Sequence, residues 1–236
     1  MQALLISDLH LSPERPVVTE AFKKFLSQQA SRAESLFILG DLFEAWIGDD
    51  DPAPLAGEVK AAIKTLTDRG VKVFFQQGNR DFLIGKRFAR ETGCTLLPDF
   101  YVTRFNGVKT LLLHGDLLCT EDTEYQRYRR RVRHPASRWL LSHLPLKRRQ
   151  KIAAQWRAKS MAANANKPEN ILDVTGEAVE KAFAEFNVSR MIHGHTHRPG
   201  VHSHPQGKRL VLGDWHDRGW YISTAGDELS LNEFPF

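Results

Sequence analysis

The stretch Met191-Ile192-His193-Gly194-His195-Thr196-His197 places three histidines within five residues, directly before Arg198-Pro199-Gly200, where a strand is expected to end. If the stretch stays extended, His195 and His197 point to the same side, because side chains alternate along a strand. Two neutral imidazoles directed at one point make half of a metal site. An isolated His-x-His is more often a polar turn, so a metal site requires oxygen ligands from elsewhere in the chain.

Four other apolar runs are typical of short buried strands, and each is followed by polar side chains. Taken alone, each has a simpler explanation; for Asp8 and His10 it is a carboxylate that caps a turn beside a surface imidazole. Ligands of open α/β sheets, however, bind at the carboxyl ends of the strands, so we expect these groups to meet. The four runs are residues 4–6 before Asp8 and His10, residues 35–39 before Gly40-Asp41, residues 71–75 before Gly78-Asn79-Arg80-Asp81, and residues 110–113 before His114-Gly115-Asp116.

Helical periodicity between these runs predicts an α/β protein. Asn106-Gly107 separates two runs, residues 101–105 and 108–114, that are typical of a β-hairpin. Short apolar runs in the C-terminal tail are expected to form antiparallel strands that complete a second sheet. The expected helices cover residues 17–29, 55–69, 83–92 and 171–186, and the expected tail strands cover residues 210–212, 220–223 and 228–231.

The chain has 236 residues, enough for one large domain or two small ones. Its composition, 42% hydrophobic and 26% charged, is that of a soluble globular protein, and no apolar run approaches the length of a membrane span. The first residues run into Ser7-Asp8 without a basic region, so we expect a strand there and not a signal peptide. Two cysteines, Cys94 and Cys119, are too few for a disulfide framework and indicate small buried residues in a reducing cytosol.

Basic residues are concentrated in one segment. Residues 125–167 contain thirteen Lys or Arg and no Asp or Glu, whereas the rest of the chain has 20 basic and 28 acidic residues, a net charge of −8. Aromatic and aliphatic residues are interleaved with the basic ones, which predicts amphipathic helices inserted as a lid over residues 120–168. Such helices bind an anionic membrane surface or nucleic acid, or they pack their charged face on the rest of the domain.

The five motifs at these strand ends, the three-histidine stretch included, resemble in order and type the signature of the calcineurin-like metallophosphoesterases. The resemblance implies one domain over residues 1–236, a four-layer αββα sandwich with the helical lid inserted. It also implies two metal ions that share one carboxylate. By resemblance, Asp8, His10, Asp41 and His197 would hold one ion, and Asp41, Asn79, His114 and His195 would hold the other.

The chemistry of these ligands agrees with the resemblance. A bridging carboxylate spans ions about 3.5–4 Å apart, and such pairs stabilise both the attacking and the leaving oxygen of a phosphoryl displacement. Imidazole, carboxylate and amide ligands without thiolate suit Mn²⁺, Fe²⁺, Zn²⁺ or Co²⁺. The resemblance favours two Mn²⁺ per chain. Water between two cations ionises near neutral pH and would supply the nucleophile.

Arg80 departs from the wider family, in which many phosphatases have a histidine directly after the motif's asparagine. Arginine forks two hydrogen bonds onto phosphate oxygens but donates no proton at neutral pH. It therefore suits a diphosphate, whose leaving group is a stable phosphate anion. In Arg80, the basic insert and the opening residues 5–11, the chain resembles the members of the family that act on UDP-2,3-diacylglucosamine. This resemblance implies water attack at the α-phosphorus and release of UMP and 2,3-diacylglucosamine 1-phosphate for lipid A synthesis.

Polar residues of the expected lid have two interpretations. From the residues alone, Asp122 could cap a helix, and Ser160, Asn164 and Lys167 could be solvated. On a helix, however, spacings of four and three place the last three on one face. The resemblance implies substrate contacts for all four. It implies catalytic roles for Asn79, Arg80, His114 and His195, and further substrate contacts for Asn79, Arg80 and His195.

Two other functions are compatible with the same motifs. A phosphodiesterase of nucleic acid would stack bases on the aromatic residues of the insert, but the aliphatic residues within 140–146 suit acyl chains or a bilayer better. A non-catalytic scaffold is expected to lose metal ligands, and all seven are present. We therefore expect a cytosolic, monomeric enzyme without a nucleic acid partner, attached peripherally to the cytoplasmic face of the inner membrane through residues 125–167.

Three further expectations concern the surroundings of the site. We expect His193 to be buried or to support a ligand, because it precedes Gly194. The acidic run Asp49-Asp50-Asp51 is assigned mainly to a solvated loop, since a complete ligand set exists without it. Arg148, Arg149 and Lys151 are expected to contribute to liposome binding through their charge.

Overall fold

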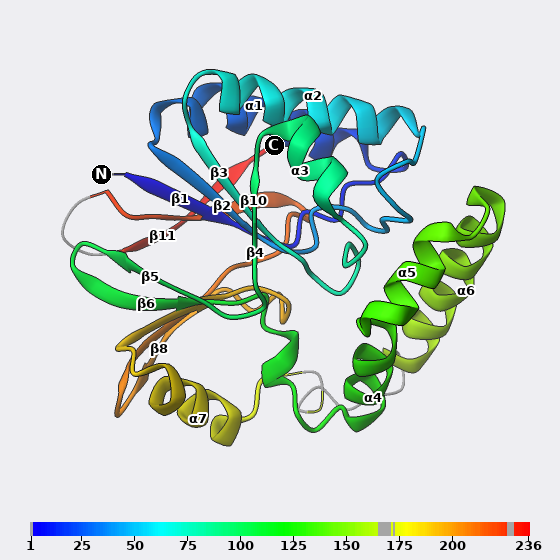
Figure 1. Cartoon of the computed structure of the whole chain (residues 1–236). Helices are drawn as coiled ribbons and strands as arrows, with labels where there is room; N and C mark the ends of the chain where they lie inside the picture. Colours follow the sequence, from blue (N-terminus) through cyan, green and yellow to red (C-terminus); the bar gives the residue numbers. More distant parts are fainter. Residues whose placement is uncertain (1, 165–170, 172, 226–228) are drawn as a thin grey trace.

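The first of two β-sheets has the strand order β11-β10-β1-β2-β3-β4 in the computed structural model, which describes residues 2–164, 171, 173–225 and 229–236 (Figure 1). Strands β1 to β4 are parallel, and β10 and β11 are antiparallel additions at the β1 edge. The bounds are β1 Ala3–Ile6, β2 Ser35–Leu39, β3 Lys72–Gln76, β4 Thr95–Leu97, β10 Arg218–Ser223 and β11 Ser230–Pro235.

The second sheet has the order β5-β6-β7-β9-β8. Strands β6, β7 and β9 are parallel, and the β5 and β8 edges are antiparallel. The predicted hairpin joins β5 to β6, and Asn106 and Gly107 both have positive φ, as a two-residue turn of this kind requires. The bounds are β5 Tyr101–Phe105, β6 Val108–Leu112, β7 Arg190–His193, β8 Gly200–His204 and β9 Gly207–Val211.

Strands β1 and β2 are apolar on both faces, because each face is covered. Leu4 and Ile6 pack toward the helices, whereas Leu5 packs against the second sheet with Leu112 and Ile192. Outside the two sheets, α1 (Pro16–Gln28), α2 (Pro54–Asp68) and α3 (Lys86–Thr92) cover the first, and α7 (Gly176–Phe186) covers the second (Figure 1). This order of layers confirms the predicted αββα sandwich.

The C-terminal strands differ from the expectation. Of the three predicted tail strands, only β9 joins the second sheet, whereas β10 and β11 extend the first, with Leu5 opposite Ile222 in β1 and β10. The prediction that the whole tail completes the second sheet is therefore wrong. Alternation of apolar residues shows that a segment is a strand, but it carries no information about the sheet edge that the strand joins.

Two helices begin later than predicted, and two strands, β4 and the polar edge strand β8, were not predicted. Thr175 provides the N-cap of α7, so this helix begins at Gly176 and not at residue 171. Helix α3 begins at Lys86, because Asp49 accepts hydrogen bonds from the backbone N–H groups at its start. Strand β4, with three residues, is too short to show periodicity.

Three helices form an insert in the connection between β6 and β7: α4 (Thr123–Val132), α5 (Pro135–His143) and α6 (Leu146–Asn164). They project beside the sandwich in Figure 1. We call these three helices the helical insert. Asp122 caps α4 and Pro135 is the first residue of α5, whereas the extended Leu144 ends α5 directly before Pro145. Within the described residues, no helix is long and apolar enough to cross a membrane.

Candidate metal centre

The ends of five strands bring the seven predicted ligands together. Asp8 and His10 follow β1, Asp41 follows β2, and Asn79 follows β3 in the first sheet. The remaining ligands come from the second sheet, where β6 and β7 are parallel neighbours. These are His114 after β6, and His195 and His197 after β7.

One group of ligands surrounds His10 Nε2. This atom lies 3.2 Å from His197 Nε2, 4.0 Å from Asp8 Oδ1 and 3.9 Å from Asp41 Oδ2. His197 Nε2 lies 3.4 Å from Asp8 Oδ1. The ligand atoms of Asp8, His10 and His197 are all within 4.8 Å of one another, a spacing that one cation can bridge.

A second group lies on the other side of Asp41. Asn79 Oδ1 is 2.9 Å from both His114 Nε2 and His195 Nδ1, and His114 Nε2 is 3.7 Å from Asp41 Oδ1. The two oxygens of Asp41 thus face different groups, Oδ2 toward His10 and Oδ1 toward His114. A carboxylate in this position is suited to bridge two cations.

Backbone strain is concentrated at the same residues. Among the described residues, seven that are not glycine have positive φ, a conformation unfavourable by about 1–2 kcal/mol for residues with a Cβ. Five of the seven are predicted ligands, and the other two are asparagines, one in a turn and one at a helix end. Strained backbone of this kind persists where the surrounding structure requires it, often at functional sites. The five ligands concerned are Asp8, His10, Asp41, His195 and His197.

The expectation of an extended His195–Thr196–His197 segment is wrong. Strand β7 ends at His193, and the φ angles of His195 and His197 are +67° and +55°. The two rings consequently reach different groups, His195 beside Asn79 and His197 beside Asp8.

The charge and burial of Asp8 fit a bound cation. Its side chain is fully buried, and Oδ1 has no hydrogen-bond partner among the described residues. Burial raises the pKa of Asp8, but contact with His197 and the charges of the nearby imidazoles outweigh it and hold the pKa well below its usual range. Burial and the neighbouring His114 lower the pKa of His195 to about 4, so this ring is neutral at pH 7, as metal ligation requires. Buried carboxylates with neutral imidazoles and an amide fit divalent cations.

Asp81 connects two of the ligand loops, a role that the sequence did not reveal. Its fully buried carboxylate accepts hydrogen bonds from the backbone N–H groups of Gly78 and Leu42, both at 2.8 Å. Burial and the charge of Asp41 raise the pKa of Asp81 to about 7. The only signal in the sequence was its place directly after Arg80 in a motif already assigned to the site.

His193 is buried, as expected, and supports the loop of His195. Its Nδ1 lies 2.8 Å from the carbonyl oxygen of Gly194, and Nε2 accepts a hydrogen bond from Arg209 at 3.0 Å. Burial and the positive charge of Arg209 lower the pKa of His193 to about 3. The ring is therefore neutral, with its proton on Nδ1.

The acidic run after Trp46 lies in a partly exposed loop, as expected, but its three carboxylates also have structural partners. Asp49 accepts hydrogen bonds from the Trp46 indole at 3.1 Å and from three backbone N–H groups at the start of α3. Asp50 pairs with both terminal nitrogens of Arg149 at 2.6 and 2.5 Å. Asp51 accepts from the N–H of Ala53 just before α2.

A cavity of about 770 Å³ joins the ligand cluster to the helical insert. Among the residues assigned to substrate, Asp122 and Ser160 line it together with Asn79, Arg80 and His195. The side chain of Asn164 and the whole of Lys167 lie outside the described residues. The cavity also has an apolar wall, by which we mean the lining residues Trp46, Ile47, Phe82, Leu83, Leu141, Ile152 and Trp156.

The inner face of α4 is bound to the sandwich by ion pairs. Arg129 contacts Asp116 at 2.6 Å and Asp99 at 2.9 Å, and Arg133 contacts Asp99 at 2.8 Å. Arg133 also donates to the carbonyl oxygen of Gly78 at 2.7 Å, in the loop that carries Asn79. These basic residues have partners inside the protein, so this part of the insert packs its charged face on the rest of the domain.

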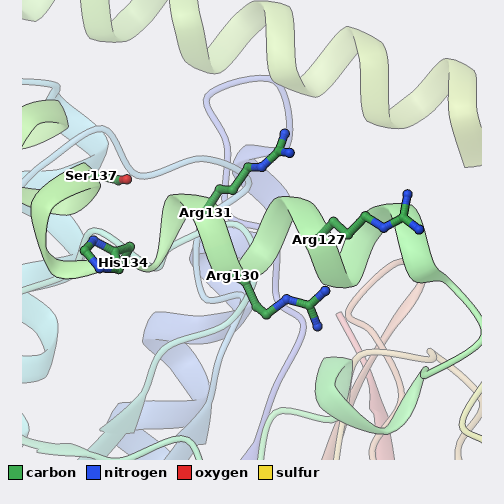
Figure 2. Close-up of a pocket in the computed structure, with 5 residues that line it drawn as sticks. All are labelled: Arg127, Arg130, Arg131, His134 and Ser137. Atoms are coloured by element: carbon green, nitrogen blue, oxygen red, sulfur yellow. The ribbon is translucent and has the colours of Figure 1, made fainter.

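Three other arginines of α4 have no such partners, and two of them, Arg127 and Arg131, also line the cavity. Arg127, Arg130 and Arg131 line a shallow hollow of about 460 Å³ with His134 and Ser137, and none of the three arginines forms an ion pair within the described part of the chain. Figure 2 shows Arg131 and Arg130 on opposite sides of the helix. The hollow is therefore a diffuse basic surface and not one convergent anion site.

Gly78 provides a test of the ligand geometry. A Cβ there would lie 2.1 Å from Asp41 Oδ1, so we expect Gly78→Ala to displace Asp41 and to weaken Mn²⁺ binding at least tenfold in isothermal titration calorimetry. Gly57→Ala, on α2 with open space around it, is the matched control and should bind Mn²⁺ like the wild type. Equal Mn²⁺ affinity of Gly78→Ala and the wild type would contradict this geometry.

Comparisons with known proteins agree with the site. The model of the family described as calcineurin-like phosphoesterase matches residues 1–199. Proteins named UDP-2,3-diacylglucosamine hydrolase from Serratia proteamaculans and Azotobacter vinelandii are 51% and 49% identical to this chain. These matches cover all of this chain and 100% and 99% of the relatives. The solved structure of an archaeal phosphodiesterase matches over the full length of both chains with a TM-score of 0.51 at 12% identity, and shows the same fold. The chain belongs to the calcineurin-like phosphoesterase family.

Proposed function

We propose that the protein is a metal-dependent hydrolase that cleaves the diphosphate bond of UDP-2,3-diacylglucosamine, giving UMP and 2,3-diacylglucosamine 1-phosphate in lipid A biosynthesis. The observation that carries the proposal is the cavity that is lined by the ligand cluster and by apolar side chains from both the sandwich loops and the helical insert. The names of relatives about half identical over their full length support the same substrate.

Two Mn²⁺ ions are the proposed cofactors. Bound cations of this kind activate water as a nucleophile near neutral pH and offset negative charge on the phosphate. Asp41 would be shared between them, since its two oxygens face the two ligand groups. Asp8, His10 and His197 would complete one set of ligands, and Asn79, His114 and His195 the other.

Arg80 is the proposed phosphate-binding residue. It lines the cavity beside the ligands, and its backbone N–H donates to Asp41 Oδ1 at 2.8 Å, which fixes its place relative to the cluster. Its guanidinium can hold phosphate oxygens as charge develops. Water attack at the α-phosphorus expels a sugar phosphate, a leaving group that needs no proton from the protein. The amide oxygen of Asn79 lies 2.9 Å from both His114 Nε2 and His195 Nδ1, so the three proposed ligand atoms converge on one point.

The apolar wall is the proposed binding surface for the acyl chains. Burial of each aliphatic or aromatic contact contributes about 25 cal/mol per Å² of apolar surface removed from water. Asp122 and Ser160 line the same cavity and offer polar groups suited to the sugar, and Asn164 and Lys167 are proposed to join them. A nucleic acid substrate would gain little from Leu83, Leu141 and Ile152, and we place this alternative second.

The helical insert is the proposed lid of a single domain, residues 1–236, and its outer surface is proposed to bind the cytoplasmic face of the inner membrane as a monomer. Trp139 and Leu140 on α5 are 63% and 56% exposed, and the exposed arginines Arg127, Arg130 and Arg131 of α4 precede them in the chain. Exposed aromatic and aliphatic side chains beside cationic ones are typical of helices that bind anionic lipid.

Arg149 does not belong to this surface, which corrects the expectation from the sequence. Its side chain is 4% exposed and is held by Asp50 and by the carbonyl oxygens of Ile47 and Leu144. Arg149 therefore anchors α6 to the sandwich. Arg148 and Lys151, which are exposed, remain available to lipid.

Substrate identity is tested by release of UMP from UDP-2,3-diacylglucosamine with Mn²⁺ present. We expect the wild type to release UMP and Asp41→Ala to be slower by a factor of about 10³ or more, because both cations lose a ligand. Asp68→Ala, an exposed carboxylate on α2, is the control and should be fully active. A wild type that ignores this lipid but cleaves an aryl phosphodiester or a single-stranded oligonucleotide would refute the proposed substrate and leave the metal centre intact.

Membrane binding is tested with vesicles that contain phosphatidylglycerol. The double variant Trp139→Ala/Leu140→Ala should partition to them at least about tenfold more weakly, because each side chain contributes about 1.5–3 kcal/mol when fully buried. Val17→Ala/Val201→Ala removes two side chains of similar exposure, 56% and 55%, from α1 and β8 and should partition like the wild type. Unchanged partitioning of the first variant would refute the proposed membrane surface.

A further inference from the structure

Glu44 lies beside the ligand cluster because two loops run together there. The N–H groups of His10 and Leu11 donate to the carbonyl oxygens of Asp41 and Leu42, at 3.0 and 2.9 Å. The N–H of Glu44 donates to the carbonyl oxygen of Leu11 at 3.1 Å. This backbone ladder holds the Glu44 carboxylate next to the His10 ring.

The two nitrogens of His10 face different surroundings. Nε2 faces Asp8, Asp41 and His197, so it is the nitrogen available to a cation. Nδ1 is buried and has no aligned hydrogen-bond partner among the described residues, but Glu44 Oε2 lies 3.3 Å from it. A histidine that ligates a metal commonly donates its other N–H to a carboxylate, which sets the tautomer and holds the ring. Glu44 is the carboxylate in position to do this.

The other oxygen of Glu44 points away from His10, toward two guanidinium groups. Arg80 Nη1 lies 3.3 Å from Oε1, and Arg157 of α6 pairs with the same oxygen. One carboxylate therefore contacts a ligand, the proposed phosphate-binding arginine and the helical insert. Arg149 anchors α6 near its start, whereas Arg157 connects a later turn of the helix to the site.

We propose that Glu44 is a positioning residue that orients His10 for the cation and couples this orientation to the seating of α6 through Arg157. The inference rests on the proposed metal centre but not on the proposed substrate. Coupling of this kind is reciprocal, so what stabilises His10 at the cation also stabilises α6 on the sandwich.

Glu44→Gln keeps the size of the side chain and removes its charge. We expect this variant to bind Mn²⁺ about 10-fold to 100-fold more weakly in isothermal titration calorimetry, because it loses the carboxylate that holds His10. Glu91→Gln is the matched control, since Glu91 is a partly exposed carboxylate that pairs with Lys60 and Arg87 far from any ligand. The control should retain wild-type affinity, and both variants should keep the wild-type melting temperature without metal.

The coupling is measured by hydrogen–deuterium exchange of α6 with and without Mn²⁺. In the wild type and in Glu91→Gln, exchange of α6 should become slower when Mn²⁺ is added. In Glu44→Gln and in Arg157→Gln, the effect of Mn²⁺ on α6 should disappear. Metal-dependent protection of α6 that is equal in all four proteins would overturn the coupling.

The outcomes separate this inference from the proposed function. If the wild type binds Mn²⁺ and Glu44→Gln binds it equally well, the positioning role falls and the metal centre stands. If the wild type binds no Mn²⁺, the metal centre and the role of Glu44 fall together. Neither result depends on the lipid substrate, because the metal is the only ligand added.

Discussion

A buried carboxylate without enough partners inside the protein must be balanced by a cation, and this constraint governs the structure around Asp8 and Asp41. Both side chains are almost completely buried, and the oxygens that face the imidazoles point into the centre of the cluster. The left-handed backbone of five ligands is unfavourable in isolation. The Asp81 carboxylate accepts hydrogen bonds from the Gly78 and Leu42 amides and holds two of the loops in place, so the fold supports this strain.

The helical insert uses its positive charge in two ways. Arg129, Arg133, Arg149 and Arg157 turn inward and pair with acids of the sandwich, so they fix α4 and α6 beside the metal centre. Arg127, Arg130 and Arg131 of α4 have no acidic partner among the described residues and leave exposed positive charge. The two interpretations of the basic segment, a packed face and an anion-binding surface, therefore apply to different residues of the same helices.

Much of the fold was predictable, and so was the convergence of the seven proposed ligands, because continuous apolar strands and the residues after them are local signals. Contacts between distant segments were not. The edge that β10 joins, the pairing of Asp50 with Arg149 and the position of Glu44 between His10 and Arg157 depend on tertiary packing. The turned backbone at His195 and His197 also depends on tertiary packing and was not visible in the sequence. Alternation within a short segment does not reveal that its backbone must turn to serve two groups of ligands.

The account depends most on Asp41 standing between two cations. Anomalous diffraction near the manganese absorption edge, from crystals grown with Mn²⁺, tests this directly. The account predicts two peaks about 3.5–4 Å apart, one on each side of the Asp41 carboxylate. A single peak, or peaks outside ligand distance of Asp41, would contradict it.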